Sequence, residues 1–219
     1  MRSKGVVFFL GLCLFAPAST GVGQQLAVPT EEQLEAIAFR SVGPGLVTGR
    51  IADIEFDPND NNTWYIASAF GGLWKTTNRG ITFDPIFDDG GSFTLCCVVV
   101  DPNDSNVIWL GTGENSSQRS AHFGDGLYKS TDAGASWRKI NKGLPSGDKG
   151  RIGLAISPIN SEVLYAVVEA VGDSGGFYRS ANRGESWQRM SGYVTGSPQY
   201  YQELVACPHK FDRVYALDS

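Results

Sequence analysis

The feature that most constrains the fold is a sequence motif that occurs three times. The copies read GGLWKTTNRGITF, GDGLYKSTDAGASW and GGFYRSANRGESW, and they begin at Gly71, Gly124 and Gly175. Each copy has the pattern of a strand, a glycine-containing tight turn and an aromatic residue that opens the next strand. A chain that repeats one hairpin in this way is expected to build a repeated β structure.

A second motif lies upstream of each copy and extends the repeat. It reads DPNDNNTWYIAS, DPNDSNVIWLGT, SPINSEVLYAVV and CPHKFDRVYALD, beginning at Asp57, Asp101, Ser157 and Cys207, so the period is about 50 residues. One repeat unit then contains an apolar strand, a proline-containing turn, a second strand, and the third and fourth strands of the hairpin. Four antiparallel strands form one blade of a β-propeller, and blades bury their faces by stacking.

The sequence therefore predicts an all-β fold, a β-propeller of four-stranded antiparallel blades over residues 41–219. About three and a half blades are present, because the fourth unit ends at Ser219 after about two strands. A closed propeller has about four to eight blades. We expect the chain to be a fragment of a larger propeller whose remaining blades come from the same longer chain, and closure by several copies is the alternative.

The N-terminal residues have the features of an export signal. A basic start at Arg2 and Lys4 precedes an apolar run, with small residues at Ala16 and Ala18. This order predicts cleavage after residues 1–18 and a secreted or periplasmic protein. The apolar run is too short to span a bilayer, so no membrane span is expected after the signal is removed.

Residues 19–40 are expected to form an N-terminal segment with one short helix. Thr30 and Gln33 have the spacing of a capping box, in which two side chains satisfy free N–H groups at a helix start.

Charge and cysteine content exclude several function classes. The formal net charge is −5, and the basic residues are scattered, so no nucleic-acid partner is expected. Cys96 and Cys97 are neighbours on a predicted strand and should point to opposite faces, which favours core packing over a disulfide. His122 has no neighbour at metal-ligand spacing, so we expect no metal and no cofactor.

The hairpin motif resembles the Asp-box, or BNR repeat, of the pattern Ser/Thr-x-Asp-x-Gly-x-Ser/Thr-Trp/Phe. The resemblance implies a propeller in which these residues are structural: Asn78, Gly80, Asp132, Gly134, Asn182 and Gly184. Asparagine keeps the acceptor oxygen of aspartate and loses its charge. A catalytic or metal-binding carboxylate would not tolerate that exchange, whereas a turn clamp would.

Function is therefore expected on the opposite face, where the connections between second and third strands meet the connections between blades. This loop face gathers four segments: residues 41–50, 111–126, 142–151 and 191–203. Loops on a rigid scaffold commonly carry binding. The predicted ligand-binding residues are Arg50, Glu114, Arg119, His122, Asp125, Arg151, Tyr200 and Tyr201. The alternative is that these are solvated loop residues that bind nothing.

The start of the first blade, GPGLVTGRIADIEFDPNDNNTWYIASAFGGLWKT, resembles that of the tandem-propeller xyloglucan-cleaving glycoside hydrolases. That resemblance implies a catalytic Asp two residues before the paired glycines, and Ala69 stands there. The same elements, with GTGE and YKS, resemble more closely the sortilin-like N-terminal propellers of large exported bacterial proteins, whose sortilin relatives bind polypeptides.

The predicted function is an exported module that binds a polypeptide or glycan through its loop face. Glycoside hydrolysis is the alternative, with Glu114 and Asp125 as its candidate acids and others outside this segment, since inverting hydrolysis needs two carboxylates. A purely structural module is the third possibility.

Overall fold

A computed structural model describes residue 30, 49–114, 122–195 and 202–217 of the chain. The predicted signal segment and most of the predicted N-terminal helix lie outside these residues. The chain divides into two units at Gly43 and Pro44, and the described strands belong to the second unit. No helix in the described ranges is long and apolar enough to cross a membrane.

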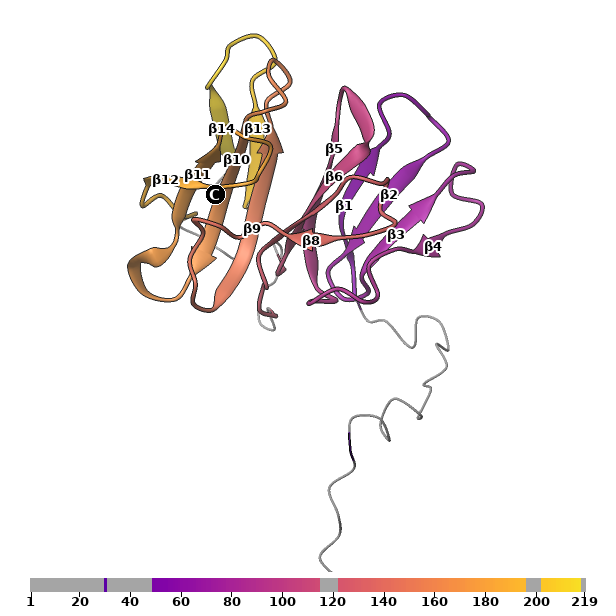
Figure 1. The fold of residues 1–219 in the computed structure, drawn as a ribbon, viewed down its shortest axis with the longest axis horizontal. Helices are drawn as coiled ribbons and strands as arrows, with labels where there is room; N and C mark the ends of the chain where they lie inside the picture. Colours follow the sequence, from indigo (N-terminus) through magenta and orange to yellow (C-terminus); the bar gives the residue numbers. More distant parts are fainter. Residues whose placement is uncertain (1–29, 31–48, 115–121, 196–201, 218–219) are drawn as a thin grey trace, which may run out of the picture. The chain divides into compact units, whose positions relative to one another are not determined.

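The described part of the second unit contains three four-stranded antiparallel sheets (Figure 1). In each sheet the strands are paired in the order in which they occur in the chain. The first sheet contains β1 (Ile51–Phe56), β2 (Trp64–Ser68), β3 (Leu73–Thr76) and β4 (Asp84–Pro85). The second contains β5 (Leu95–Asp101), β6 (Asp104–Thr112), β7 (Leu127–Ser130) and β8 (Arg138–Lys139). The third contains β9 (Lys149–Ile156), β10 (Leu164–Ala170), β11 (Gly176–Ser180) and β12 (Gln188–Ser191).

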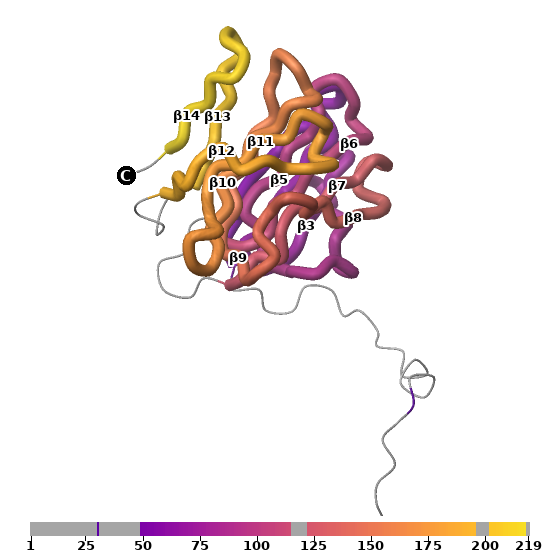
Figure 2. Tube along the Cα trace, turned by 60° about the vertical axis from the view of Figure 1, so that its left-hand side comes forward, coloured from indigo at the N-terminus to yellow at the C-terminus, as the bar shows by residue number. Residues whose placement is uncertain are grey.

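Two further strands, β13 (Glu203–Ala206) and β14 (Val214–Leu217), form a hairpin of their own. In Figure 2 this yellow hairpin lies beside the orange strands of the third sheet, and β13 contacts β9 and β10. The only helical element of the described residues is a 3-10 turn at Gly172–Ser174. The prediction of an all-β propeller fragment made of four-stranded antiparallel blades is confirmed.

The first strands of successive units lie next to one another, β1 against β5, β5 against β9, and β9 against β13. Apolar side chains fill the space between successive sheets. Tyr65 and Leu110 belong to the core between the first two sheets, and Trp109 and Trp187 to the core between the second and third. Burying one large aliphatic side chain stabilises a fold by about 1.5–3 kcal/mol. The buried core clusters therefore lie where the repeats predict that the blades stack.

The adjacent cysteines depart from the expected strand geometry. Pairing between β5 and β6 shifts register between Leu95 and Cys97, which marks a bulge at Cys96. The bulge turns both side chains to one side, with Sγ atoms 3.6 Å apart, so the expectation of opposite faces was wrong. Both thiols are free and buried in the core, and Gly111 leaves the space they occupy.

Candidate functional site

The three hairpin turns, Thr76–Phe83, Ser130–Trp137 and Ser180–Trp187, are called repeat turns below. In the second turn, the Asp132 carboxylate accepts hydrogen bonds from the N–H of Ser136 at 2.8 Å and from its hydroxyl at 2.5 Å. In the first turn, Asn78 Oδ1 accepts the N–H of Thr82 at 2.9 Å, while its amide donates to the Thr82 hydroxyl at 2.8 Å. Aspartate and asparagine thus close the same turn, with the side-chain donor and acceptor exchanged.

The third repeat turn has the same geometry. Asn182 Oδ1 accepts the N–H of Ser186 at 3.0 Å, and the hydroxyl of Ser180 accepts the N–H of Gly184 at 2.9 Å. Within the described ranges, no group of three His, Cys, Asp or Glu side chains could hold a metal ion. The side chains of Asn78, Asp132 and Asn182 are thus used to close their own turns.

On the loop face, Arg50 and Glu114 form an ion pair. The Glu114 side chain is 0% exposed, and Arg50 is 46% exposed. Neither oxygen of the Glu114 carboxylate accepts a hydrogen bond from a described residue. Burying a charged carboxylate costs free energy unless the charge is paired. Among the described residues, the charge of Arg50 offsets this cost for Glu114.

An aromatic cluster, formed by Phe70, Phe93 and His122, lies near this pair. His122 meets Phe70 edge-on, with ring centroids 4.5 Å apart, and lies 5.7 Å from Phe93. Two backbone N–H groups, of Gly71 and Gly72, donate to the Phe93 carbonyl at 3.1 and 2.9 Å and hold the two loops together. Phe93 is 57% exposed, and His122 is also exposed. Large exposed aromatic groups gathered in one place are typical of binding surfaces.

The backbone connects the aromatic cluster to the ion pair. The N–H of Ala69 donates to the carbonyl of Arg50 at 2.9 Å. Gly49 lies so close to Phe70 that an added Cβ would be 2.9 Å from the Phe70 Cβ. A hollow of 310 Å³ beside Arg50 is lined by Gly49, Ser68 and Trp74, among others. Arg50, Glu114 and His122 are therefore the predicted residues that the structure brings into one region.

The other described candidates lie in separate ion pairs. Asp125 accepts hydrogen bonds from Lys139 Nζ at 2.7 Å and from the Tyr128 hydroxyl. Burial opposes ionisation of Asp125, but these two hydrogen bonds outweigh it and lower its pKa. Arg151 is buried and pairs with Glu169, with Nε and Oε2 3.0 Å apart. Arg119, Tyr200 and Tyr201 lie outside the described residues.

Sequence reasoning missed Phe70 and Phe93. Each flanks a glycine pair in a connection, in the stretches FGG at residues 70–72 and GGSF at residues 90–93. A search for aromatic residues beside Gly-rich loops would have found both. Neither residue lies in the longest connection, where the predicted charged residues are concentrated.

Two carboxylates on β1 were also missed. Asp53 Oδ2 accepts the N–H of Val98 on β5 at 2.9 Å. Burial raises the pKa of Glu55 to about 7; nearby Asp53 adds to the shift, and the N–H of Val100 opposes it. Both line a cavity of 330 Å³ among β1, β5, β9 and β13. Their bonds to β5 show that they satisfy N–H groups of the neighbouring sheet's first strand.

Several curated proteins that resemble this chain are xyloglucanases. No family model matches the chain. The xyloglucanase Xgh74A of Acetivibrio thermocellus is 27% identical over 154 residues, which cover 62% of this chain and 17% of the relative. A xyloglucanase of a Paenibacillus species is 29% identical over 154 residues, covering 64% of this chain and 14% of the relative. An oligoxyloglucan-reducing end-specific xyloglucanase of Emericella nidulans is 28% identical over 152 residues, covering 64% of this chain and 17% of the relative.

The fold has a counterpart among solved structures. The crystal structure of the Niastella koreensis GH74 enzyme matches with a TM-score of 0.54 at 24% identity, over 74% of this chain and 24% of that chain. At this identity the likeness shows the β-propeller fold alone. The chain spans only a small part of the length of the relatives it matches.

Proposed function

We propose that this chain is an exported β-propeller module that binds a glycan through its loop face, with its repeat turns serving as structural Asp-boxes. The observation that carries the proposal is the aromatic cluster of Phe70, Phe93 and His122 beside the Arg50–Glu114 ion pair. Carbohydrate rings present C–H groups that pack on aromatic side chains and hydroxyl groups that bond to polar ones. A few oriented polar groups among aromatic side chains are the usual composition of a ligand site.

A glycan is favoured over a polypeptide because the curated relatives are named xyloglucanases. The ligand class proposed is accordingly a branched β-glucan. Polypeptide binding, suggested by the resemblance to sortilin-like propellers, is the outcome that the experiment below separates from it.

Hydrolysis is a second candidate because of the same relatives, and the described residues favour binding over it. Inverting cleavage needs one carboxylate to activate water and another to protonate the leaving group. Ala69 occupies the position at which the resemblance implies one of these acids, and it is fully buried. Glu114 is committed to Arg50, and Asp125, with its lowered pKa, is poorly suited to donate a proton.

The binding test is calorimetric titration of the full chain with xyloglucan oligosaccharides. We expect saturable binding that Phe93→Ala weakens by about tenfold, the size of one lost aromatic contact. The control is Phe211→Ala, which removes an aromatic side chain of similar exposure from a proline turn on the opposite face. Equal affinity of wild type and Phe93→Ala, or binding of peptides alone, contradicts the proposal.

The cleavage test is the release of reducing ends from xyloglucan. We expect none above background from the wild-type chain. Turnover that Glu114→Gln abolishes while ligand binding persists would replace the binding proposal with the hydrolase one. Turnover unchanged by Glu114→Gln would exclude Glu114 as the acid.

A further inference from the structure

Each repeat turn of the second and third sheets docks on the preceding sheet. Between the first two sheets, Lys75 Nζ donates to the carbonyl of Ala133 in the repeat turn at 3.0 Å. The indole N–H of Trp137 donates to the carbonyl of Ile86 at 2.8 Å. Gly134 lies on the same isoleucine, since an added Cβ would be 2.6 Å from Ile86 Cδ1.

The contact between the second and third sheets repeats these interactions. Lys129 Nζ donates to the carbonyl of Arg183 at 3.0 Å, and the indole N–H of Trp187 donates to the carbonyl of Ile140 at 3.0 Å. An added Cβ on Gly184 would be 2.8 Å from Ile140 Cδ1. We call the two contacted positions the turn-docking surface of a sheet. The first position is the cation near the end of the third strand, Lys75 or Lys129. The second is the aliphatic residue that follows the aromatic residue of the repeat turn by three positions, Ile86 or Ile140.

The third sheet has the same turn-docking surface. Arg179 occupies the position of Lys75 and Lys129, directly before the Ser or Thr that starts the repeat turn. Met190 occupies the position of Ile86 and Ile140. Met190 is 52% exposed, whereas Ile140 is 3% exposed under the third repeat turn. No repeat turn among the described residues covers Arg179 and Met190.

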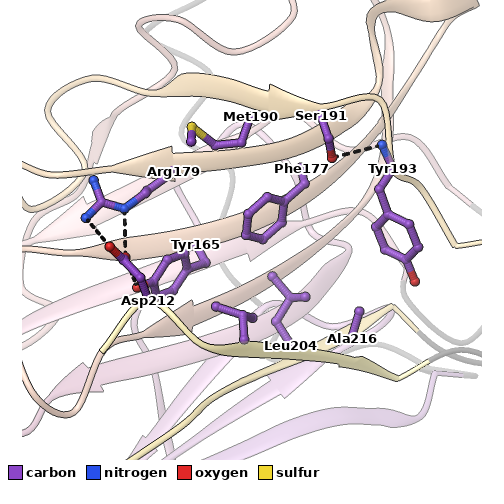
Figure 3. Close-up of a pocket in the computed structure, with 10 residues that line it drawn as sticks. Tyr165, Phe177, Arg179, Met190, Ser191, Tyr193, Leu204, Asp212 and Ala216 are labelled. Carbon is purple, nitrogen blue, oxygen red and sulfur yellow. Dashed lines mark hydrogen bonds and ion pairs between the residues drawn. The ribbon is translucent and has the colours of Figure 1, made fainter. Parts of the chain in front are cut away.

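A groove of 670 Å³ lies over this surface. Figure 3 shows the Arg179–Asp212 pair at one end and Tyr193 at the other, with the ring of Phe177 between them. Arg179 Nε donates to Asp212 Oδ1 at 3.0 Å. Lys129 both pairs with Glu185 and donates to the turn carbonyl of Arg183. The guanidinium of Arg179 carries five N–H donors, so it can likewise hold Asp212 and still donate to a turn carbonyl. The groove is mostly apolar with one cation, as at the two occupied surfaces.

We infer that this groove is the docking site of a fourth repeat turn, carried by the third and fourth strands of the sheet that β13 and β14 begin. Continuity argues for this occupant. β13 and β14 pair as the first two strands of the other sheets do, and β13 contacts β9 and β10 of the third sheet. A third strand paired with β14 then leads its turn onto Arg179 and Met190. The docking segment has a glycine with positive φ and, three residues later, a tryptophan, because Gly134–Trp137 and Gly184–Trp187 have that spacing.

The test supplies that segment and measures whether the groove accepts it. Residues 126–141, the hairpin of the second sheet, are joined after Ser219 through a short Gly-Ser linker, with the full chain otherwise unchanged. We expect the melting temperature to rise by about 5 °C, since added native contacts of 1–2 kcal/mol shift a domain of this size by that amount. Met190→Glu in the extended protein is expected to remove the rise. The same substitution in the unextended chain tests its direct effect at this exposed position.

A matched extension separates specific docking from added length. It carries alanine in place of the appended tryptophan and valine in place of the appended glycine, and it should give no rise. Equal rises from both extensions, or no rise from either, would overturn the inference. Light scattering of the unextended chain tests the competing occupant. A stable dimer that Met190→Glu dissociates would mean that a second copy, not a fourth turn, fills the groove.

Discussion

The indole N–H of Trp187 donates a hydrogen bond to the backbone carbonyl of Ile140, 3.0 Å away on the preceding sheet. Trp137 makes the equivalent bond to Ile86. Each bond joins an aromatic ring that packs between two sheets to a carbonyl at the end of a fourth strand. The aromatic residue of the repeat is therefore a link between blades, and its substitution should be felt in stability rather than in ligand binding.

The first prediction concerns this hydrogen bond. Trp187→Phe keeps a ring between the sheets and leaves the Ile140 carbonyl without its indole donor, so the free energy of unfolding should fall by about 1 kcal/mol. Trp187→Ala should cost about 3–5 kcal/mol because a cavity is added. Urea denaturation measures both. Phe83→Trp is the control in the first sheet, where the side chain is exposed, and should change stability by less than about 0.5 kcal/mol.

The second prediction concerns the glycine of the repeat turn. Gly134 has φ of +93°, and an added Cβ would lie 2.6 Å from Ile86 Cδ1. Gly134→Ala should destabilise by more than about 1 kcal/mol, through backbone strain and contact with the isoleucine. Adding Ile86→Ala removes the clash with the new methyl group and should restore that part of the lost stability. A double-mutant cycle by thermal denaturation measures this coupling. Gly147→Ala, where the added methyl meets open space, should be nearly neutral.

The third prediction concerns the acid of the second repeat turn. Asp132→Asn should leave the melting temperature unchanged, because Asn78 and Asn182 close their turns with the same backbone bond. Asp132→Ala should lower it, since the N–H of Ser136 loses its acceptor. Scanning calorimetry of the two variants measures both melting temperatures. An equal loss in both variants would mean that the charge, rather than the acceptor oxygen, holds the turn.

The fourth prediction is a pH dependence from Glu55. Burial raises its pKa in the folded chain to about 7, so the folded state disfavours the charged form. Its contribution to stability is fully present below its ordinary pKa of 4.5 and is lost as pH rises through about 7. Glu55→Gln should match wild type near pH 4 and be more stable by about 1 kcal/mol at pH 8, a value reduced for partial exposure.

Chemical denaturation across this range measures the effect of Glu55→Gln. Asp89→Asn, which removes an exposed carboxylate in a connection, should give no such pH-dependent difference. A constant gap between wild type and Glu55→Gln from pH 4 to pH 8 would contradict the assignment.

The fold was predictable because the repeats carry it. The period places Pro58 and Pro102 in equivalent turns, and four strands per unit follow from strand length and turn chemistry. The bulge at Cys96 was not predictable, because it depends on packing against Gly111 and on the carbonyl of Ile152 that accepts the Cys97 thiol. Local alternation of side chains is a weak guide where a strand is buried on both faces.

The candidate site was predictable only in part. Placing Arg50, Glu114 and His122 on one face followed from blade topology, but their pairing did not. Which cation faces which acid depends on the conformation of the loops, and Asp125 and Arg151 form separate pairs with Lys139 and Glu169. Phe70 and Phe93 come together in the aromatic cluster because backbone hydrogen bonds join their two loops, which are separate in the sequence.

The second and third repeat turns each dock on the sheet before them, which gives the array a direction. A sheet completed early already presents the cation and the aliphatic side chain that the next turn requires. Assembly can therefore advance in one direction, as a filament grows at one end, and it can keep pace with a polypeptide that emerges N-terminus first. The same direction makes each completed sheet a template for the next, and leaves the docking surface of the third sheet exposed at Met190.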